Sequence, residues 1–200
     1  MSGENISFNL MPKQFEKPYV LINPFKEDYH CNLIIDNFNN MIENQTDLIP
    51  EGEKDKAKSV KRGSFFTIGQ LEKIDHPLMK ILRTIIIYSN ENYFAYDIYP
   101  WFTENFLKLN IYTENDGEYD WHIDGNATNM VVDYKLTVIM NISDNNNYEG
   151  GQFELLNGPE FNLKKGEVII FGSHHAHRVK PVTNGIRKTL AFWVNGPKWR

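Results

Sequence analysis

The sequence is poor in cysteine, with Cys31 as its single cysteine among 200 residues. One cysteine cannot form an internal disulfide, and a zinc site built from several thiolates is excluded as well. Long apolar runs are also missing: stretches such as residues 168–171 are only a few residues long, whereas a membrane-spanning helix needs ~20. Residues 1–5 lack the basic and then apolar order of a secretory signal. We therefore expect a cytoplasmic protein without a membrane partner.

An excess of positive charge is missing too. Lysine and arginine number 21 against 26 aspartates and glutamates, which gives a net charge of −5. Because domains that bind duplex nucleic acid usually carry a basic surface, we expect no nucleic-acid partner. What the chain does contain is apolar material, 41% hydrophobic and 14% aromatic residues, which is enough for a core and excludes a disordered chain. The length and the lack of linkers or repeats predict a single domain over residues 1–200, with a helical part at about 1–95 and a β-rich part at about 96–200.

The helical part contains two predicted helices. Asn23 and Pro24 are typical of an N-cap and a first helical position, so we expect a helix from there to about Met41. Apolar residues at helical spacing follow Pro77, and they predict a second helix that Asp75 and Pro77 open. Short strands are expected at residues 18–22 and 63–68.

A mixed run of charged residues lies at 51–62. Such a run is typical of a solvated, mobile loop. A second interpretation is a lid over a binding site, with residues 51–66 as the first candidate because the run ends in Phe65 and Phe66.

Short apolar or alternating runs dominate the β-rich part, and clusters of Asn, Asp and Gly separate them. We expect strands at 106–112, 119–123, 135–142, 151–156, 160–163, 167–171, 175–179 and 187–194. About eight strands at this spacing favour a β-sandwich or barrel. The predicted fold is therefore mainly β with N-terminal helices: a double-stranded β-helix (jelly roll) buttressed by two or three helices.

Two groups of residues have the chemistry of metal ligands. His122 and Asp124 alternate along a predicted strand, so both side chains point to one face and can reach one cation, although this short pattern is common by chance. The second group is the tract His174, His175 and His177. In a strand the last two share a face, and the tract leaves open which of its members is functional. Two histidines and one carboxylate form the facial triad of non-haem Fe(II) oxygenases.

An arginine and a tyrosine occupy unusual places in two other strands. Arg187 shares its predicted face with Ala191 and Trp193, and a buried guanidinium needs an anionic partner. A carboxylate ligand held bidentately would provide one; alternatively, Arg187 reaches solvent at a strand end. Tyr112 lies on a polar face of its strand, with Lys108 and Asn110. That face encloses a polar cavity or is exposed to solvent.

In this order, the motifs resemble those of a known family, the 2-oxoglutarate/Fe(II)-dependent dioxygenases, in its prolyl 4-hydroxylase-like branch. The resemblance covers roughly residues 106–195. It rests on Tyr112 ten residues before His122-x-Asp124, on Y-E-G-G-Q-F at 148–153, on G-E-V-I-I-F at 166–171, and on H-R-V-K-P-V-T-N-G-I-R at 177–187. The strand at 135–140 departs from relatives that carry a co-substrate tyrosine there, so that contact is absent or is made by Tyr134.

The resemblance implies roles for these residues. His122, Asp124 and His177 would ligate Fe(II), and the last motif selects His177 within the histidine tract. Arg187 would bind the far carboxylate of the co-substrate 2-oxoglutarate, with Tyr112 and Thr189 adding hydrogen bonds. The presence of Asp124 favours hydroxylation, because halogenating relatives lack this carboxylate.

The implied activity is a dioxygenase reaction that uses O2 and 2-oxoglutarate, releases succinate and CO2, and hydroxylates a C–H bond. Ascorbate is a candidate reductant. The first expected substrate is a prolyl residue or a proline-like compound. Alternatives are the same chemistry on a small molecule, another side chain or a nucleobase, and a jelly-roll module that only binds a ligand. The sequence does not predict an oligomeric state.

Overall fold

The computed structural model describes residues 18–44, 61–99, 106–114, 117–125 and 132–199. The helices are α1 (Asp28–Asn44) and α2 (Pro77–Ser89), with short helical turns η1 (Leu71–Lys73), η2 (Asn90–Phe94) and η3 (Asn145–Asn147). The strands are β1 (Tyr19–Ile22), β2 (Lys61–Arg62), β3 (Ser64–Gln70), β4 (Phe106–Thr113), β5 (Glu118–His122), β6 (Val132–Asn141), β7 (Tyr148–Gly150), β8 (Phe153–Leu155), β9 (Glu160–Phe161), β10 (Val168–Gly172), β11 (His177–Val179) and β12 (Val182–Pro197).

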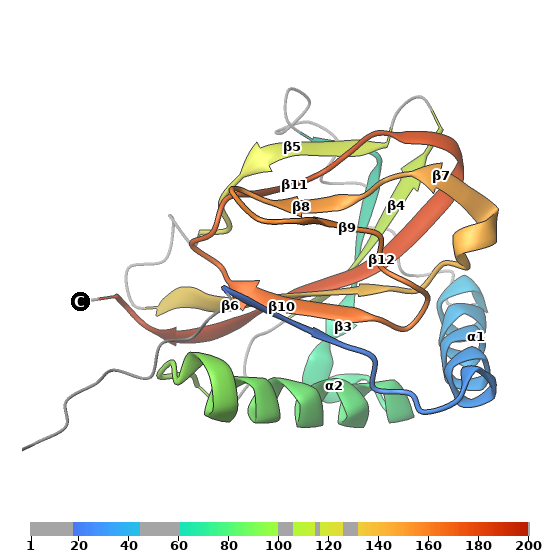
Figure 1. The fold of residues 1–200 in the computed structure, drawn as a ribbon. Helices are drawn as coiled ribbons and strands as arrows, with labels where there is room; N and C mark the ends of the chain where they lie inside the picture. Colours follow the sequence, from blue (N-terminus) through green and yellow to red (C-terminus); the bar gives the residue numbers. More distant parts are fainter. Residues whose placement is uncertain (1–17, 45–60, 100–105, 115–116, 126–131, 200) are drawn as a thin grey trace, which may run out of the picture.

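The strands form two sheets that face each other. The larger sheet has the order β1-β10-β6-β12-β4-β3, and β7 pairs with the N-terminal end of β12. The smaller sheet has the order β2-β5-β11-β8-β9. All of the strand pairs are antiparallel. Figure 1 shows the smaller sheet above the larger one, with α2 along the lower face of the larger sheet and α1 at one end. The observed architecture is the predicted one, a β fold buttressed by two helices.

The larger sheet is buried on both faces, which explains the continuous apolar sequence of β10. One face packs against the helices through residues such as Leu190, Phe192 and Val194. The other face, which includes Ala191, packs against the smaller sheet. Because side chains alternate along a strand, β12 contributes to both cores, as its alternation predicts. Arg187 and Thr189 share the inner face with Ala191 by the same alternation.

Helix α1 begins later than the sequence suggests. The prediction of an N-cap at Asn23 is wrong, since the helix starts at Asp28. Asn23 instead caps a local turn, in which its Oδ1 accepts a hydrogen bond from the backbone N–H of Phe25 at 3.0 Å. Asparagine serves turns and helix caps by the same side-chain contact, so the residue type alone does not separate the two.

Helix α2 begins at Pro77 as predicted, but its cap is His76 rather than Asp75. The Nδ1 atom of His76 accepts a hydrogen bond from the backbone N–H of Leu78 at 3.2 Å. The ring is buried, and Nε2 lies 3.1 Å from Asn37 Oδ1 of α1. Because an amide oxygen only accepts, Nε2 carries the proton and Nδ1 is free to cap. His76 thus joins the two helices.

The predicted loop over the charged run is partly wrong. Its last residues, Lys61 and Arg62, form β2 and pair with β5. Residues 51–60 lie outside the described part of the chain, so a lid role for that run stays a prediction. The predicted strand at 175–179 also begins later, at His177, because the preceding residues form a turn in which the His175 N–H donates to Gly172 O.

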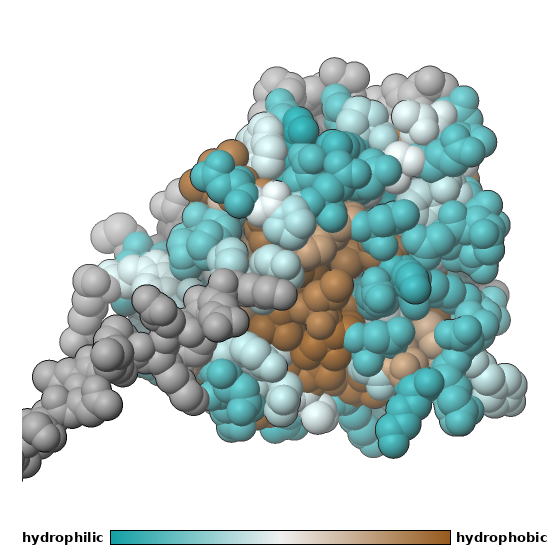
Figure 2. Space-filling view, viewed as in Figure 1, coloured by the Kyte–Doolittle hydropathy of each residue, from teal (hydrophilic) through white to brown (hydrophobic). Residues whose placement is uncertain are grey.

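Within the described ranges, neither helix is long and apolar enough to cross a membrane. Figure 2 shows hydrophilic residues over most of one face, with an apolar strip across the region where β1 and β10 lie in Figure 1. Strand β1 is the edge of the larger sheet, and Leu21 on it is exposed.

Candidate metal centre

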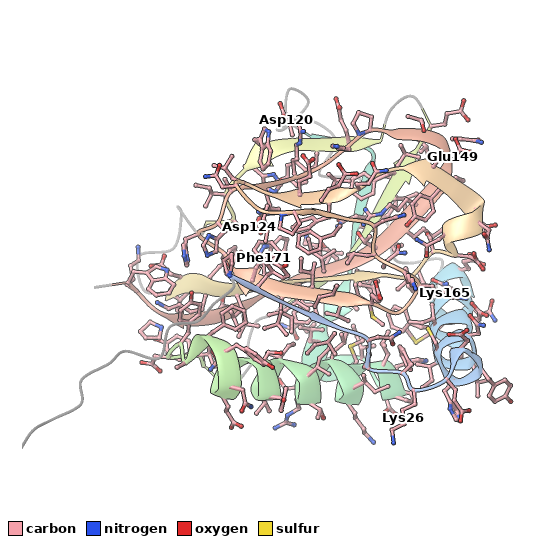
Figure 3. The ribbon with its side chains drawn as sticks, viewed as in Figure 1. Lys26, Asp120, Asp124, Glu149, Lys165 and Phe171 are labelled. Atoms are coloured by element: carbon pink, nitrogen blue, oxygen red, sulfur yellow. The ribbon has the colours of Figure 1, made fainter. Side chains whose placement is uncertain are left out.

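Two histidines meet because β5 and β11 are neighbours in the smaller sheet. His122 is the last residue of β5 and His177 the first residue of β11, and the two are direct partners in the antiparallel register. Asp124 follows two residues after the end of β5. In the view of Figure 3, Asp124 and Phe171 of β10 lie between the smaller sheet and the larger one. The chain therefore brings residues about 50 positions apart to one place by strand pairing.

The three side chains form a compact donor set. One ligand atom from each of His122, Asp124 and His177 lies within 4.8 Å of the others, and this is the one such group among the described residues. Asp124 Oδ1 is 3.8 Å from His122 Nε2, and Asp124 Oδ2 is 3.4 Å from His177 Nε2. The carboxylate thus faces both imidazoles, and all three donors can reach one cation.

Backbone carbonyls fix the orientation of both rings. His122 Nδ1 is 2.7 Å from Asp120 O, and His177 Nδ1 is 3.0 Å from His175 O. A carbonyl oxygen only accepts hydrogen bonds, so each Nδ1 carries the proton and each Nε2 keeps its lone pair toward Asp124. A metal-binding histidine commonly has this second contact, which sets its tautomer.

The environment of His177 favours the neutral, ligating form of its ring. Burial lowers the pKa of His177 below its usual value, although Asp124 and the hydrogen bond to His175 O partly offset this effect. The ring packs against Phe171, with centroids 4.8 Å apart, and against Phe153 at 5.6 Å. A neutral imidazole can donate its lone pair to a metal without first losing a proton.

The other histidines of the tract lie elsewhere. His174 and His175 belong to the turn before β11, and neither joins the donor set. The His174 ring forms T-shaped pairs with Tyr96 and Trp199, at centroid distances of 6.4 and 5.6 Å. Of the three histidines of the tract, His177 is the one that lies beside His122 and Asp124.

A candidate anion site lies at Arg187 on the inner face of β12. The residue is 2% exposed, yet its Nη1 atom has no hydrogen-bond partner among the described residues. Its guanidinium lies 5.6 Å from the centre of the Tyr112 ring, on the neighbouring strand β4. The alternative of a solvent-exposed strand end is therefore wrong. A buried guanidinium with an unpaired N–H is costly unless an anion completes it.

Tyr112 and Thr189 line the same inner face. Burial raises the pKa of Tyr112 far above its usual value; Arg187 lowers it, and Tyr119 and Asp124 raise it. Tyr112 therefore lies within electrostatic range of both Arg187 and Asp124, and its phenol stays protonated. Thr189 Oγ1 accepts a hydrogen bond from Asn110 Nδ2 at 3.3 Å. These three predicted residues share one wall of the interior.

Gly151 shapes this wall by lacking a side chain. Its φ is +66°, a left-handed conformation that favours glycine. A Cβ atom there would come within 2.8 Å of Arg187 Cδ. The Gly150-Gly151 pair at the end of β7 therefore serves the turn, as predicted, and Gly151 also leaves space for the arginine.

The residues present fit Fe(II) and a dicarboxylic acid. Two imidazoles and one carboxylate suit a divalent transition metal, and three protein ligands leave three octahedral positions open. The unpaired N–H of Arg187 needs a hydrogen-bond acceptor, and a carboxylate such as the distal one of 2-oxoglutarate would suit it. The donor set and the arginine are thus compatible with Fe(II) and 2-oxoglutarate, the metal and co-substrate that the resemblance implies.

Three further aromatic residues lie beside these groups. Tyr119, which the sequence did not single out, stacks on the His122 ring at a centroid distance of 3.5 Å. Tyr134, which the resemblance offers as an alternative co-substrate contact, stacks on Trp193 at 5.5 Å, and its pKa is raised by burial and then by Asp124. Trp193, which strand alternation places on the face of Arg187, has a buried Nε1 without a hydrogen-bond partner in the described part of the chain.

Residues 107–195 match the model of the 2OG-Fe(II) oxygenase superfamily. This segment is a 2OG-Fe(II) oxygenase domain. The match begins at β4 and ends within β12, so it contains the triad and the arginine site. The family implies Fe(II), 2-oxoglutarate and O2. The match confirms the predicted family for this segment and supports the predicted oxidoreductase activity.

Curated relatives of this oxygenase domain carry the name PKHD-type hydroxylase. The protein from Synechococcus sp. (strain CC9311) is 38% identical over 85 residues, which is 41% of this chain and 38% of the relative. The protein from Xylella fastidiosa (strain M12) is 34% identical over 101 residues, or 44% of this chain and 43% of the relative. The chain thus spans less than half the length of these curated relatives.

Solved prolyl hydroxylases share the fold of the oxygenase chain. A prolyl hydroxylase from Trichoplax adhaerens, solved with a hypoxia-inducible factor peptide fragment, aligns with a TM-score of 0.65 and 17% identity, covering 88% of this chain and 83% of that chain. A prolyl-4-hydroxylase from Pseudomonas putida aligns with a TM-score of 0.64 and 12% identity, covering 90% and 93%. These likenesses confirm the predicted jelly-roll fold.

Proposed function

We propose that this oxygenase is a dioxygenase that hydroxylates a C–H bond of a prolyl residue in a peptide, with succinate and CO2 as co-products. The observation that carries the proposal is the joint presence of a His-Asp-His donor set and a buried arginine with an unpaired N–H. Three such donors alone could also hold Zn(II), and a buried guanidinium alone could pair with many anions. Together they match a reaction that needs one metal and one dicarboxylic acid.

In this proposal His122, Asp124 and His177 hold Fe(II). When bound with 2-oxoglutarate, the metal supplies O2 activation. The protein holds three donor atoms in fixed positions and leaves the other coordination positions of the metal open. The hydrogen bonds of the two Nδ1 atoms keep both Nε2 lone pairs toward the cation.

Arg187 binds the distal carboxylate of 2-oxoglutarate in a site from which water is largely excluded. The planar guanidinium can donate two parallel hydrogen bonds to a carboxylate. Tyr112, which stays protonated, is a hydrogen-bond donor on the same wall, and Thr189 Oγ1 is a further polar group. Low local polarity strengthens these contacts.

The choice of a prolyl residue in a peptide as the substrate is supported by the similar proteins. The curated relatives are named hydroxylases. The solved neighbours from Trichoplax adhaerens and Pseudomonas putida are prolyl hydroxylases, and the first was solved with a peptide fragment.

The test is an O2-dependent assay with Fe(II), 2-oxoglutarate and ascorbate as the proposed reductant. We expect succinate formation to depend on all three of O2, Fe(II) and 2-oxoglutarate. His122→Ala, Asp124→Ala and His177→Ala should each abolish it, whereas His30→Ala, at an exposed site on α1, should not. Full turnover in Asp124→Ala would remove this residue from the ligand set.

The substrate is tested separately by mass spectrometry. Proline-containing peptides should gain the mass of one oxygen atom, and matched peptides with alanine in place of proline should not. If free proline or another small molecule is hydroxylated and the peptides are not, the dioxygenase assignment stands and the peptidyl substrate is wrong.

A further inference from the structure

The carboxylate of Asp124 is held by a residue of the opposite sheet. Thr137 lies in β6, at the centre of the larger sheet, where its register partners are Phe171 and Trp193. Its Oγ1 atom is 2.8 Å from Asp124 Oδ2. The same Oγ1 is 2.9 Å from the Oγ atom of Ser173, which follows directly after β10. Both hydroxyl residues are buried, at 1% and 0% exposure.

The carboxylate of Asp124 determines which hydroxyl donates and which accepts in these two hydrogen bonds. An ionised carboxylate only accepts hydrogen bonds, so Thr137 must donate its single proton to Asp124. Thr137 Oγ1 then acts as an acceptor, and Ser173 donates to it. The chain runs from Ser173 through Thr137 to Asp124, and each hydroxyl has one defined role.

Asp124 needs such support more than the two histidines do. The carboxylate torsion of aspartate is broad and has no strong rotamer preference. Asp124 also lies past the end of β5, outside the strand ladder. The histidine rings are oriented by backbone carbonyls, whereas the Asp124 carboxylate accepts its hydrogen bond from the Thr137 hydroxyl.

We propose that Thr137 and Ser173 are positioning residues that orient Asp124 for metal binding and so set the metal affinity of the site. This inference rests on the proposed function, because it assigns the two hydroxyls a role toward the metal. Groups that orient a ligand from behind typically change metal affinity by roughly 10–100-fold when they are removed. A purely structural pair would affect folding and leave the metal affinity unchanged.

The experiment measures Co(II) binding by the full chain without O2, from the visible absorption of the bound ion. Thr137→Val keeps the shape of the side chain and removes the hydroxyl, and we expect it to weaken Co(II) binding by roughly 10-fold or more. Thr137→Ser restores the hydroxyl and should bind within a few-fold of the native chain. The absorption spectrum of Thr137→Val should also change, because the carboxylate is free to rotate.

Ser173→Ala and Ser143→Ala form a matched pair. Both remove a buried serine hydroxyl, but the Ser143 hydroxyl accepts from the Lys188 N–H, away from the triad. We expect weaker Co(II) binding in Ser173→Ala alone, and this pair decides the matter if Thr137→Val does not fold. Native Co(II) affinity in folded Thr137→Val, or equal affinity in the two serine variants, would overturn the inference. Failure of the native chain to bind Co(II) would instead contradict the proposed function, and the inference with it.

Discussion

Arg187 shows how one residue can define a ligand. Its side chain is almost completely buried, and Nη1 has no partner in the described part of the chain. Gly151 leaves it space, and Tyr112 covers it from the neighbouring strand. A buried guanidinium with an unpaired N–H is costly, so we expect an anion to bind here, and the residue carries information about the co-substrate.

Removing this guanidinium should weaken 2-oxoglutarate binding far more than Fe(II) binding. A buried, charge-assisted pair is worth about 2–5 kcal/mol, so Arg187→Ala should raise the 2-oxoglutarate concentration needed for half-maximal turnover at least about 30-fold. Arg187→Lys keeps the charge but loses the planar fork, and its effect should be smaller. Lys188→Ala is the control, since that neighbour faces away and pairs with Glu43. Unchanged co-substrate dependence in Arg187→Ala would exclude the residue from the site.

Single residues were predictable to different degrees. His122, Asp124 and Arg187 were candidates because of their types and their positions along predicted strands, whereas His177 was selected within its tract only by the resemblance to a family motif. Thr137 was not, because threonine is an ordinary strand residue and its role depends on a contact with Asp124 across the two sheets. A sequence pattern along one strand carries no signal for such a contact.

At the scale of elements, local signals predicted most of the strands, but not β2, and they predicted the start of α2 but not that of α1. Alternation in β4 and β12 predicted correctly which residues share a face, since that property depends on neighbours in sequence, but it left open which face is the inner one. The pairing of β5 with β11, which builds the metal centre, depends on long-range register. The cap of α2 was misassigned for a related reason: His76 caps because α1 supplies Asn37 to hold its ring.

This cap should make stability depend on pH. Burial lowers the pKa of His76, partly offset by Asp75, so the unfolded chain binds a proton there more readily than the folded chain. The stability that the cap contributes is therefore complete above the unfolded value of about 6.5 and is lost as the pH falls below it. Urea unfolding between pH 8 and pH 5, taken as a rough range around that value, should show this loss.

His76→Asn supplies a cap that does not titrate, and it should reduce the slope of stability against pH. The slope should not vanish, because burial also lowers the pKa values of His174, His175 and His177. His30→Asn, at an exposed position on α1, is the control. An equal slope in His76→Asn and the native chain would show that the cap does not titrate in this range.

At the scale of the whole molecule, the candidate metal and anion sites lie between two sheets whose strands are far apart in the sequence. His122 and His177 come from the smaller sheet, Arg187, Tyr112 and Thr189 come from the larger sheet, and Asp124 is bound to the larger sheet through Thr137. The sequence predicted two layers of strands. It could not predict which sheet supplies which of these residues, because that depends on which strands pair. A metal with 2-oxoglutarate would therefore join both layers.

Binding of a metal and 2-oxoglutarate between the two sheets should stabilise the fold, and the effect of 2-oxoglutarate should depend on the metal. Ligand at about 100 times its dissociation constant adds about 2.7 kcal/mol, which raises the melting temperature of a chain this size by roughly 5–10 °C. Because one end of 2-oxoglutarate needs the metal and the other needs Arg187, the 2-oxoglutarate shift should be large with Mn(II) and small without it. Differential scanning fluorimetry without O2 measures both. Arg187→Ala should keep the Mn(II) shift and lose most of the 2-oxoglutarate shift, whereas an equal 2-oxoglutarate shift with and without metal would mean that the two ligands do not meet between the sheets.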